Sequence, residues 1–171
     1  NDVAVVSGRL LYPDGRIQYA GPVRNLGARA WFDHRYRFKP EDWGPAGIPG
    51  PVLSATGACM YMTSEALDKV GLLDERYPMA YEDVDWCLRA WQAGLRVMYF
   101  PAASLYHHES ATRGTAVGER ERISRRLFWG RWGEFFDARD VHTAEGKLRI
   151  AYVTEGTGVG GGHRDIFEHL H

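Results

Sequence analysis

The feature that most constrains the fold of this sequence is a helical apolar pattern that runs directly into a β-rich segment. After Asp83, apolar side chains recur every three or four positions, at Val84, Cys87, Leu88, Trp91 and Leu95. This spacing predicts an amphipathic helix, and Gly94 marks its end. Residues 96–100 follow as a strand that Pro101 is expected to stop. A helix that leads straight into a strand predicts an α/β domain.

The rest of the chain up to residue 137 also divides into short elements separated by turn signals. The patterns predict strands at residues 3–12, 17–19 and 53–62 and helices at residues 64–70 and 117–137. The turn signal at residues 13–15 (PDG) joins the first two strands as a hairpin. Thr63 or Ser64 is expected to cap the helix that Gly71 ends.

Residues 20–52 form a long segment without clear periodicity, rich in Gly, Pro, Trp and Arg. Loops of this length inside a compact domain are usually functional. The segment contains five aromatic residues, namely Trp31, Phe32, Tyr36, Phe38 and Trp43. Two interpretations stay open: these rings stack on sugars, or they pin the loop to the core.

The composition excludes two broad classes of protein. Of 171 residues, 44% are hydrophobic and 13% aromatic, which is enough to build a core and excludes a disordered chain. Lys and Arg number 21 against 22 Asp and Glu, so the chain lacks the basic footprint of a nucleic-acid binder. The local exception is residues 119–131, which carry five Arg and two Glu. This run is either a solvated helical face or a contact for the phosphates of a sugar diphosphate or a membrane.

Cysteine usage and hydropathy suggest a reducing compartment. Cys59 and Cys87 match no metal-ligand spacing, and we expect both to be free thiols within apolar surroundings. No apolar run is long enough to span a membrane. We expect a cytoplasmic enzyme, with the inner face of a membrane as a possible working place, and an excerpt of a longer protein.

The segment with most chemical content is the acidic turn at residues 82–85. Glu82, Asp83 and Asp85 place three carboxylates at the start of the predicted helix. Acidic residues in a first helical turn favour the macrodipole, which is a sufficient reason for one or two of them. Arg89 lies four residues after Asp85, so we expect a helical ion pair that orients the turn.

A second candidate is the pair His107 and His108. Adjacent side chains on an extended strand point to opposite faces, so one imidazole can face a site while the other does not. Histidine is a frequent ligand of divalent metals, although such pairs are also common as structural or surface residues. Together with the acidic turn, the pair is a candidate for a base and a metal ligand.

Six short motifs in series resemble family-2 glycosyltransferases, in particular the rhamnosyltransferase-like members that build bacterial polysaccharides. They are residues 56–60 (TGACM), 64–67 (SEAL), 70–75 (VGLLDE), 82–89 (EDVDWCLR), 93–96 (AGLR) and 107–110 (HHES). Residues 6–18 are similar to the segment that follows the nucleotide-binding half in those enzymes. The resemblance covers roughly residues 3–115.

The resemblance implies a reaction and the residues that carry it. Asp83 would be the general base on the acceptor hydroxyl, and direct displacement would invert the anomeric carbon. Glu82 would bind the acceptor or hold the loop. The substrate-binding set would comprise Thr56, Gly57, Ala58, Asp85, Trp86 and Arg89. His107, or His108 as the alternative, would bind Mg²⁺ or Mn²⁺, which neutralises the leaving diphosphate.

The resemblance also implies the domain organisation and the partners. Residues 1–136 would be the carboxy-terminal, acceptor-side part of a GT-A-type domain with a mixed sheet flanked by helices, lacking the nucleotide-binding half. Such a fragment would be inactive alone. The partners would be a nucleotide-sugar donor and a glycan or lipid-linked acceptor, with no nucleic acid. We also expect peripheral membrane association, and self-association through an exposed sheet edge.

The tail has a separate resemblance. Residues 137–147 form a polar linker, and residues 148–171 resemble the first strand, Gly-rich loop and helix start of a family-4 (GT-B type) glycosyltransferase. A flexible Gly-rich connection is the alternative. For the chain as a whole, a non-catalytic carbohydrate-binding module and a metal-dependent hydrolase are the alternative functions.

Overall fold

The computed structural model describes residues 2–24, 32–108 and 118–141, and the backbone alone for residues 24 and 137–141. The chain divides into two compact units, residues 1–133 and 134–171. The proposed tail domain at residues 148–171, most of the linker and Trp31 lie outside the described residues. The first unit contains the sheet, two complete helices and the candidate site.

The described chain contains both strands and helices, as the sequence predicts, and most of the strands come before the first α-helix. The strands are β1 (Val3–Leu11), β2 (Ile17–Tyr19), β3 (Pro22–Arg24), β4 (Phe32–His34), β5 (Gly50–Pro51), β6 (Tyr61–Met62) and β7 (Arg96–Tyr106). The helices are the 3₁₀ turn η1 (Gly44–Gly47), α1 (Ser64–Val70), α2 (Glu82–Gln92) and α3 (Glu119–Val141). Thr63 caps α1, because its side-chain oxygen accepts a hydrogen bond from the Ala66 amide at 3.2 Å.

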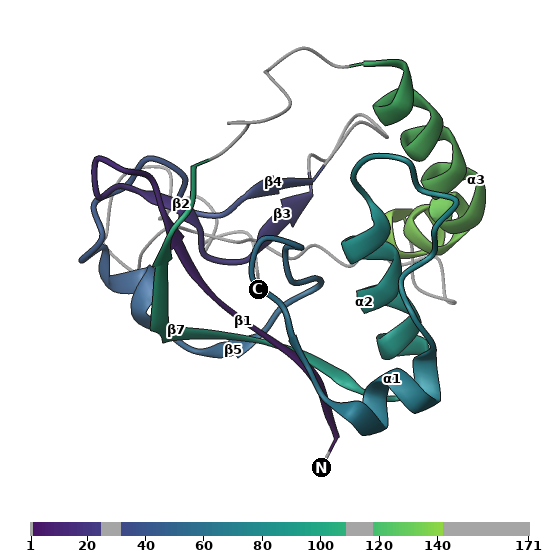
Figure 1. Cartoon of the computed structure of the whole chain (residues 1–171), viewed down its shortest axis with the longest axis horizontal. Coiled ribbons are helices and arrows are strands. Elements are labelled where there is room, and N and C mark those ends of the chain that lie inside the picture. Colours follow the sequence, from purple (N-terminus) through teal and green to yellow (C-terminus); the bar gives the residue numbers. More distant parts are fainter. Residues whose placement is uncertain (1, 25–31, 109–117, 142–171) are drawn as a thin grey trace, which may run out of the picture. The chain divides into compact units, whose positions relative to one another are not determined.

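The main sheet is mixed, with strand order β2-β1-β7-β5, and β6 pairs with β1 as well. β1 and β7 run parallel side by side (Figure 1), whereas β2, β5 and β6 pair antiparallel. β3 and β4 form a separate antiparallel pair. The predicted hairpin of β1 and β2 is confirmed, and the turn before Arg16 is closed by Asp14.

Strand β7 continues past Pro101, which the sequence predicts as its end. The register against β1 shifts between Ser7 and Arg9, where Tyr99 is followed by Ser104 as the next partner. Pro101 falls in this irregular stretch, where its missing N–H costs no ladder hydrogen bond. Gly8 lies opposite, and a Cβ there would approach the Ala103 carbonyl oxygen to 2.6 Å. Only glycine therefore fits this close approach of the two strands.

The predicted strand over residues 53–62 is wrong for most of its length. Only Tyr61 and Met62 form a strand, and residues 56–59 make a tight turn in which the Cys59 amide donates to the Thr56 carbonyl at 2.9 Å. The apolar run that suggested a strand reflects burial instead: Ala55 is buried in the core. This turn faces the start of α2.

The core lies between the sheet and helices α1 and α2, which pack beside β1 and β7 (Figure 1). Its buried members include Val5, Leu10, Trp86, Cys87, Ala90 and Val97. The indole N–H groups of Trp86 and Trp91 donate to the Gly71 and Leu53 carbonyls at 2.7 and 3.0 Å. These bonds fix α2 against the loops around it, and so fix the position of its first turn.

Candidate functional site

A cavity of about 570 Å³ opens at the first turn of α2. Four parts of the chain line it: the turn at residues 56–58, residues 79–84, the ends of β1, β2 and β7, and the segment around β4. Helix α3 adds Glu121. Sequence segments far apart in the chain therefore meet here, as they do in a ligand site.

Asp83 lies at the edge of this cavity with both carboxylate oxygens held by backbone amides. Its Oδ2 accepts from the Gly57 amide at 2.7 Å, and its Oδ1 accepts from the Val84 amide at 2.8 Å. The side chain is half-buried. Two neutral donors thus fix its orientation without adding a full positive charge beside it.

The electrostatic environment of Asp83 disfavours its ionised form. Burial raises the pKa of Asp83 above its usual range, and the amides of Gly57 and Val84 oppose this shift, as does the nearby His34 when charged. A carboxylate with a raised pKa in a cleft is suited to accept a proton. The geometry and the direction of the pKa shift therefore agree on Asp83 as a candidate base.

The backbone immediately before α2 is strained. Ala80 and Tyr81 have φ values of 63° and 72°, in the left-handed region that non-glycine residues rarely adopt. Two such residues in succession cost about 1–3 kcal/mol each and need support from their surroundings. No side chain caps the helix at Tyr81, so the strained turn itself sets where α2 begins.

Helix α3 supplies that support. The Met79 amide donates to the Ser124 hydroxyl at 3.1 Å, and Arg120 donates to the Pro78 carbonyl at 2.8 Å. The Tyr81 ring packs on Phe128 with centroids 4.9 Å apart. The loop that precedes Asp83 is therefore held from outside by α3.

The predicted residues Thr56, Gly57, Ala58 and Glu82 all line the cavity beside Asp83. A Cβ built on Gly57 would lie 3.5 Å from Asp83 Oδ2 and 3.8 Å from Glu82 Oε1. The turn at residues 56–58 thus forms the wall opposite the two carboxylates. The structure brings this part of the predicted site together.

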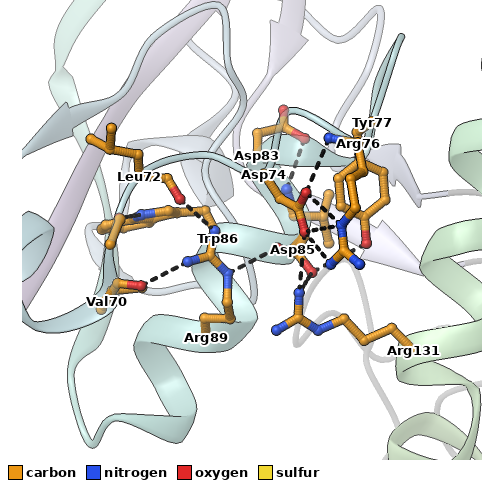
Figure 2. A network of polar contacts seen from close by, with 12 residues as sticks. Val70, Leu72, Asp74, Arg76, Tyr77, Asp83, Asp85, Trp86, Arg89 and Arg131 are labelled. Atoms are coloured by element: carbon orange, nitrogen blue, oxygen red, sulfur yellow. Dashed lines mark hydrogen bonds and ion pairs between the residues drawn. The ribbon is translucent and has the colours of Figure 1, made fainter.

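Asp85 points away from the cavity and is completely buried, with 0% of its surface exposed. Its Oδ1 accepts from the Trp132 indole at 2.8 Å and the Tyr77 hydroxyl at 3.2 Å, and Arg131 Nη1 lies 3.1 Å away. Its Oδ2 accepts from Arg89 Nε at 2.9 Å, which confirms the expected ion pair. Figure 2 shows Asp85 facing both arginines while Asp83 points elsewhere.

Arg89 and Trp86 also contribute to the structure around the acidic turn. The remaining nitrogens of Arg89 donate to the Val70 and Leu72 carbonyls at 2.8 and 2.9 Å, which ties the end of α1 to α2 (Figure 2). Trp86 is completely buried. None of Asp85, Trp86 and Arg89 lines the cavity. The structure places these three residues away from the cavity, where burial and hydrogen bonds make them supports of the turn. Their assignment to the substrate-binding set stays a prediction.

His107 and His108 both line the cavity that Glu82 and Asp83 line. His107 is half-buried, and its Nδ1 lies 2.7 Å from Gln18 Oε1. An Nδ1–H that donates to this oxygen leaves Nε2 with a lone pair, the form in which imidazole binds a metal. Residues 2–24, 32–108 and 118–136 contain no group of three or more His, Cys, Asp or Glu side chains that could hold a metal alone. His107 thus fits one ligand position only.

Several cavity residues carry no signal in the sequence. Gln18, His34, Arg37 and Glu121 line the cavity, although the sequence singled out none of these four as a site residue. Gln18 is buried and orients His107, and the Gln18 carbonyl lies 2.9 Å from His34 Nδ1. Local sequence patterns do not mark these residues as site residues, because the fold brings them to the cavity.

The aromatic residues of the long loop mostly attach it to the rest of the molecule. Tyr36 and Trp43 pack against the core, and Phe38 stacks on Tyr12 with centroids 5.2 Å apart. Phe32 differs, because it lines the cavity and stacks on Trp129 at 6.2 Å. Among the described rings of this loop, Phe32 is therefore the one that can both stack on a sugar in the cavity and attach the loop to the rest of the molecule.

The cysteines are free, as predicted. Cys87 is buried in the core, and burial raises the pKa of its thiol to about 12, so it is protonated and unreactive at neutral pH. Within the parts of the chain that the structure describes, no helix has both the length and the apolarity to cross a bilayer.

The comparisons with known proteins agree with one another on a family. Residues 48–126 match the family model described as "Glycosyltransferase like family 2". The chain is 40% identical over 116 residues to the uncharacterized protein y4gI of Sinorhizobium fredii, and 36% identical over 119 residues to the O-antigen biosynthesis protein RfbC of Myxococcus xanthus. It is 39% identical over 64 residues to an N-acetylglucosaminyl-diphospho-decaprenol L-rhamnosyltransferase of Mycobacterium tuberculosis.

These matches cover different shares of the proteins concerned. The first two each cover 66% of this chain but only 13% and 9% of the relatives, and the third covers 37% of this chain and 21% of the relative. The comparisons support a family-2 glycosyltransferase. The mixed sheet flanked by helices is consistent with a partial GT-A fold, so the predicted fold class is confirmed. The family-4 resemblance of residues 148–171 stays a prediction.

Proposed function

We propose that this chain, with the family-2 glycosyltransferase sequence at residues 48–126, forms the acceptor side of an inverting sugar transfer from a nucleotide-diphospho-sugar. Asp83 is the general base. The observation that carries the proposal is the Asp83 carboxylate held by the Gly57 and Val84 amides at the edge of a cavity of about 570 Å³. The names of two relatives, concerned with O-antigen biosynthesis and rhamnosyl transfer, support polysaccharide synthesis as the setting.

The proposed reaction accounts for each bond that forms and each bond that breaks. Asp83 removes the proton from the acceptor hydroxyl as that oxygen attacks the anomeric carbon from the face opposite the diphosphate. The bond between the anomeric carbon and the diphosphate oxygen breaks, and the nucleoside diphosphate leaves with both electrons. Attack from the opposite face inverts the configuration. Glu82 and the turn at residues 56–58 contact the acceptor beside the base.

The proposal includes one metal ligand from the described residues. His107, oriented by Gln18, would offer Nε2 to Mg²⁺ or Mn²⁺, with His108 as the neighbouring alternative. When bound, the cation would neutralise the negative charge of the leaving diphosphate. Its other ligands would come from the diphosphate and from groups outside the described residues.

The donor and acceptor belong to the same proposal. A lipid-linked or glycan acceptor fits the printed name of the rhamnosyltransferase relative, which refers to a diphospho-decaprenol. Because the chain spans only 13% and 9% of the length of its first two relatives, we expect the 171 residues to be inactive alone.

The test is release of nucleoside diphosphate from a panel of nucleotide sugars, with Mg²⁺ or Mn²⁺, by the longest form of the protein that contains this chain. Asp83→Asn should lower the rate roughly 10²–10⁴-fold while donor binding persists. A matched control is Glu65→Gln, which removes an acidic residue from the first turn of α1, outside the cavity lining. Sugar binding without any nucleotide dependence, unchanged by Asp83→Asn, would instead establish a carbohydrate-binding module.

A further inference from the structure

The outward side of α3 carries a basic and apolar surface that the proposed transfer does not use. We define the α3 outer face as Arg122, Ile123, Arg125, Arg126 and Leu127. Its three arginines line a shallow hollow together with Trp129, which also stacks on the ring of Phe32. All three arginines are exposed.

Helical geometry separates this surface from the side of α3 that supports the loop before Asp83. Ser124, Phe128 and Trp132 are buried, and their spacing of four residues places them on one side of the helix. Arg122 and Arg126 form a second row with the same spacing, and Ile123 and Leu127 form a third row next to it. A basic row and an apolar row therefore run side by side along the outward side.

The apolar row lies partly exposed on the surface of the helix. Ile123 and Leu127 expose 38% and 39% of their surfaces. A solvated helical face would place polar residues at these positions. A site for a small soluble phosphate would need the arginines and would gain nothing from the isoleucine and leucine.

The charge of the surface is local. The chain has a formal net charge of −1, whereas residues 119–133 carry five Arg against Glu119 and Glu121. Glu119 pairs with Arg122 at 2.9 Å, and Glu121 lines the cavity instead. The α3 outer face thus presents concentrated positive charge on a chain that is close to neutral.

We propose that the α3 outer face binds the surface of an anionic phospholipid membrane. The arginines contact lipid phosphates, and Ile123 and Leu127 enter the boundary between headgroups and acyl chains. A basic row beside an apolar row lets one face of a helix contact an anionic membrane surface through both charge and apolar area.

The position of α3 gives this binding a consequence for the site. The buried side of the same helix holds the loop before Asp83 through Ser124, Arg120 and Phe128. A helix is about 10 Å thick, so a membrane on its outer side would lie close to the cavity rim. The lipid binding itself does not depend on the proposed transfer and can be tested separately.

The experiment is co-sedimentation of the full 171-residue chain with vesicles of phosphatidylcholine alone and of phosphatidylcholine mixed with phosphatidylglycerol. We expect binding to the anionic vesicles that weakens with salt. The triple variant Arg122→Gln, Arg125→Gln, Arg126→Gln should lose affinity roughly 100-fold, at about fivefold per arginine. A matched control with the same charge loss is Arg16→Gln, Lys69→Gln, Arg96→Gln, which should bind as the unmodified chain does. Circular dichroism melts verify that each variant is folded.

A second variant separates a membrane from a free phosphate. Ile123→Ser with Leu127→Ser keeps all the arginines, and we expect it to lose vesicle binding several-fold. Binding of inorganic pyrophosphate that the arginine triple variant abolishes, without binding to anionic vesicles, would overturn the proposal in favour of a soluble phosphate site. Equal binding to neutral and anionic vesicles, or equal losses in the triple variant and its control, would overturn it as well.

Discussion

Asp83 and Asp85 are identical side chains two residues apart in the first turn of α2, yet their surroundings differ in kind. Asp83 is held by two neutral backbone amides at the edge of a cavity. Asp85 is completely buried between Arg89 and Arg131, with Trp132 and Tyr77 as further donors. Neutral donors orient Asp83 without placing a full positive charge beside it, whereas Asp85 is held in a buried network with two arginines. The comparison teaches that one acidic turn can combine a candidate base with a structural carboxylate.

The largest expected effect separates the two residues by rate. Asp83→Asn should lower the transfer rate roughly 10²–10⁴-fold, because the amide cannot accept the acceptor proton. The free energy of unfolding should fall by less than the loss expected for Asp85→Asn. The Asn nitrogen must face the amide of Gly57 or Val84, but burial raises the pKa of Asp83 and so disfavours its charged form in the folded protein. Steady-state kinetics and urea unfolding of the same preparation measure both quantities.

The pH dependence sharpens this prediction. A raised folded-state pKa contributes stability that is fully present below the unfolded pKa of about 3.9 and is lost as the pH rises through the folded pKa. In Asp83→Asn, the free energy of unfolding should no longer show this decrease with rising pH. The acid limb of kcat/KM should lie above the ordinary pKa of an Asp in the unmodified protein, because the base must be ionised. An acid limb at the pKa of an ordinary Asp would contradict the assignment.

The second prediction concerns stability and Asp85. Asp85→Asn should lower the free energy of unfolding by about 3 kcal/mol, because it breaks a buried ion pair from one side. The amide nitrogen must face either the Arg89 Nε–H or the Trp132 N–H, so a donor meets a donor in both orientations. Chemical denaturation with tryptophan fluorescence measures the change.

Asp68→Asn is the matched control, because Asp68 is an exposed aspartate on α1. Its free energy of unfolding should change by less than about 0.5 kcal/mol. If Asp85→Asn kept full stability but lost as much activity as Asp83→Asn, the structural interpretation of Asp85 would be wrong and a direct role in the reaction would follow.

The sequence predicted the acidic turn and its helix well, because both depend on local patterns. The apolar spacing of α2, the ion pair of Asp85 with Arg89 and the cap at Thr63 all involve residues three or four positions apart. The sequence could not show which carboxylate faces the cavity. That depends on Arg131 and Trp132, which lie 46 and 47 residues further along the chain.

The sequence predictions that the structure contradicts also depend on contacts between residues far apart in the chain. The strand predicted at residues 53–62 is interrupted by a turn at residues 56–59, where the Gly57 amide bonds to Asp83 across 26 residues of sequence. The end predicted at Pro101 fails, because the parallel partner β1 has Gly8 at the irregular register. Gln18 and His34 reach the cavity through packing alone. Long-range contacts therefore decided each point at which local patterns were misleading.

A smaller effect is expected on the cavity wall that faces Asp83. Gly57→Ala would place a methyl group 3.5 Å from Asp83 Oδ2, an ordinary van der Waals contact, so the fold should tolerate it. The methyl group would occupy space next to the base, and kcat/KM for the acceptor should fall about tenfold. Gly44→Ala is the control, since a Cβ there meets nothing within 4 Å. Equal kinetics for the two variants would mean that the acceptor does not approach residue 57.

The smallest expected effect tests whether the Asp83 side of the comparison stores strain. Ala80 has a φ of 63°, which costs a non-glycine residue about 1–2 kcal/mol, whereas glycine loses about 0.5–1 kcal/mol of chain entropy on folding. Ala80→Gly should therefore raise the free energy of unfolding by up to about 1 kcal/mol. Ala93→Gly, at an ordinary φ of −76°, should lower it by a similar amount. If urea unfolding gives changes of opposite sign in the free energy of unfolding for the two variants, the turn before Asp83 is strained. If both variants lose the same free energy, the turn is relaxed.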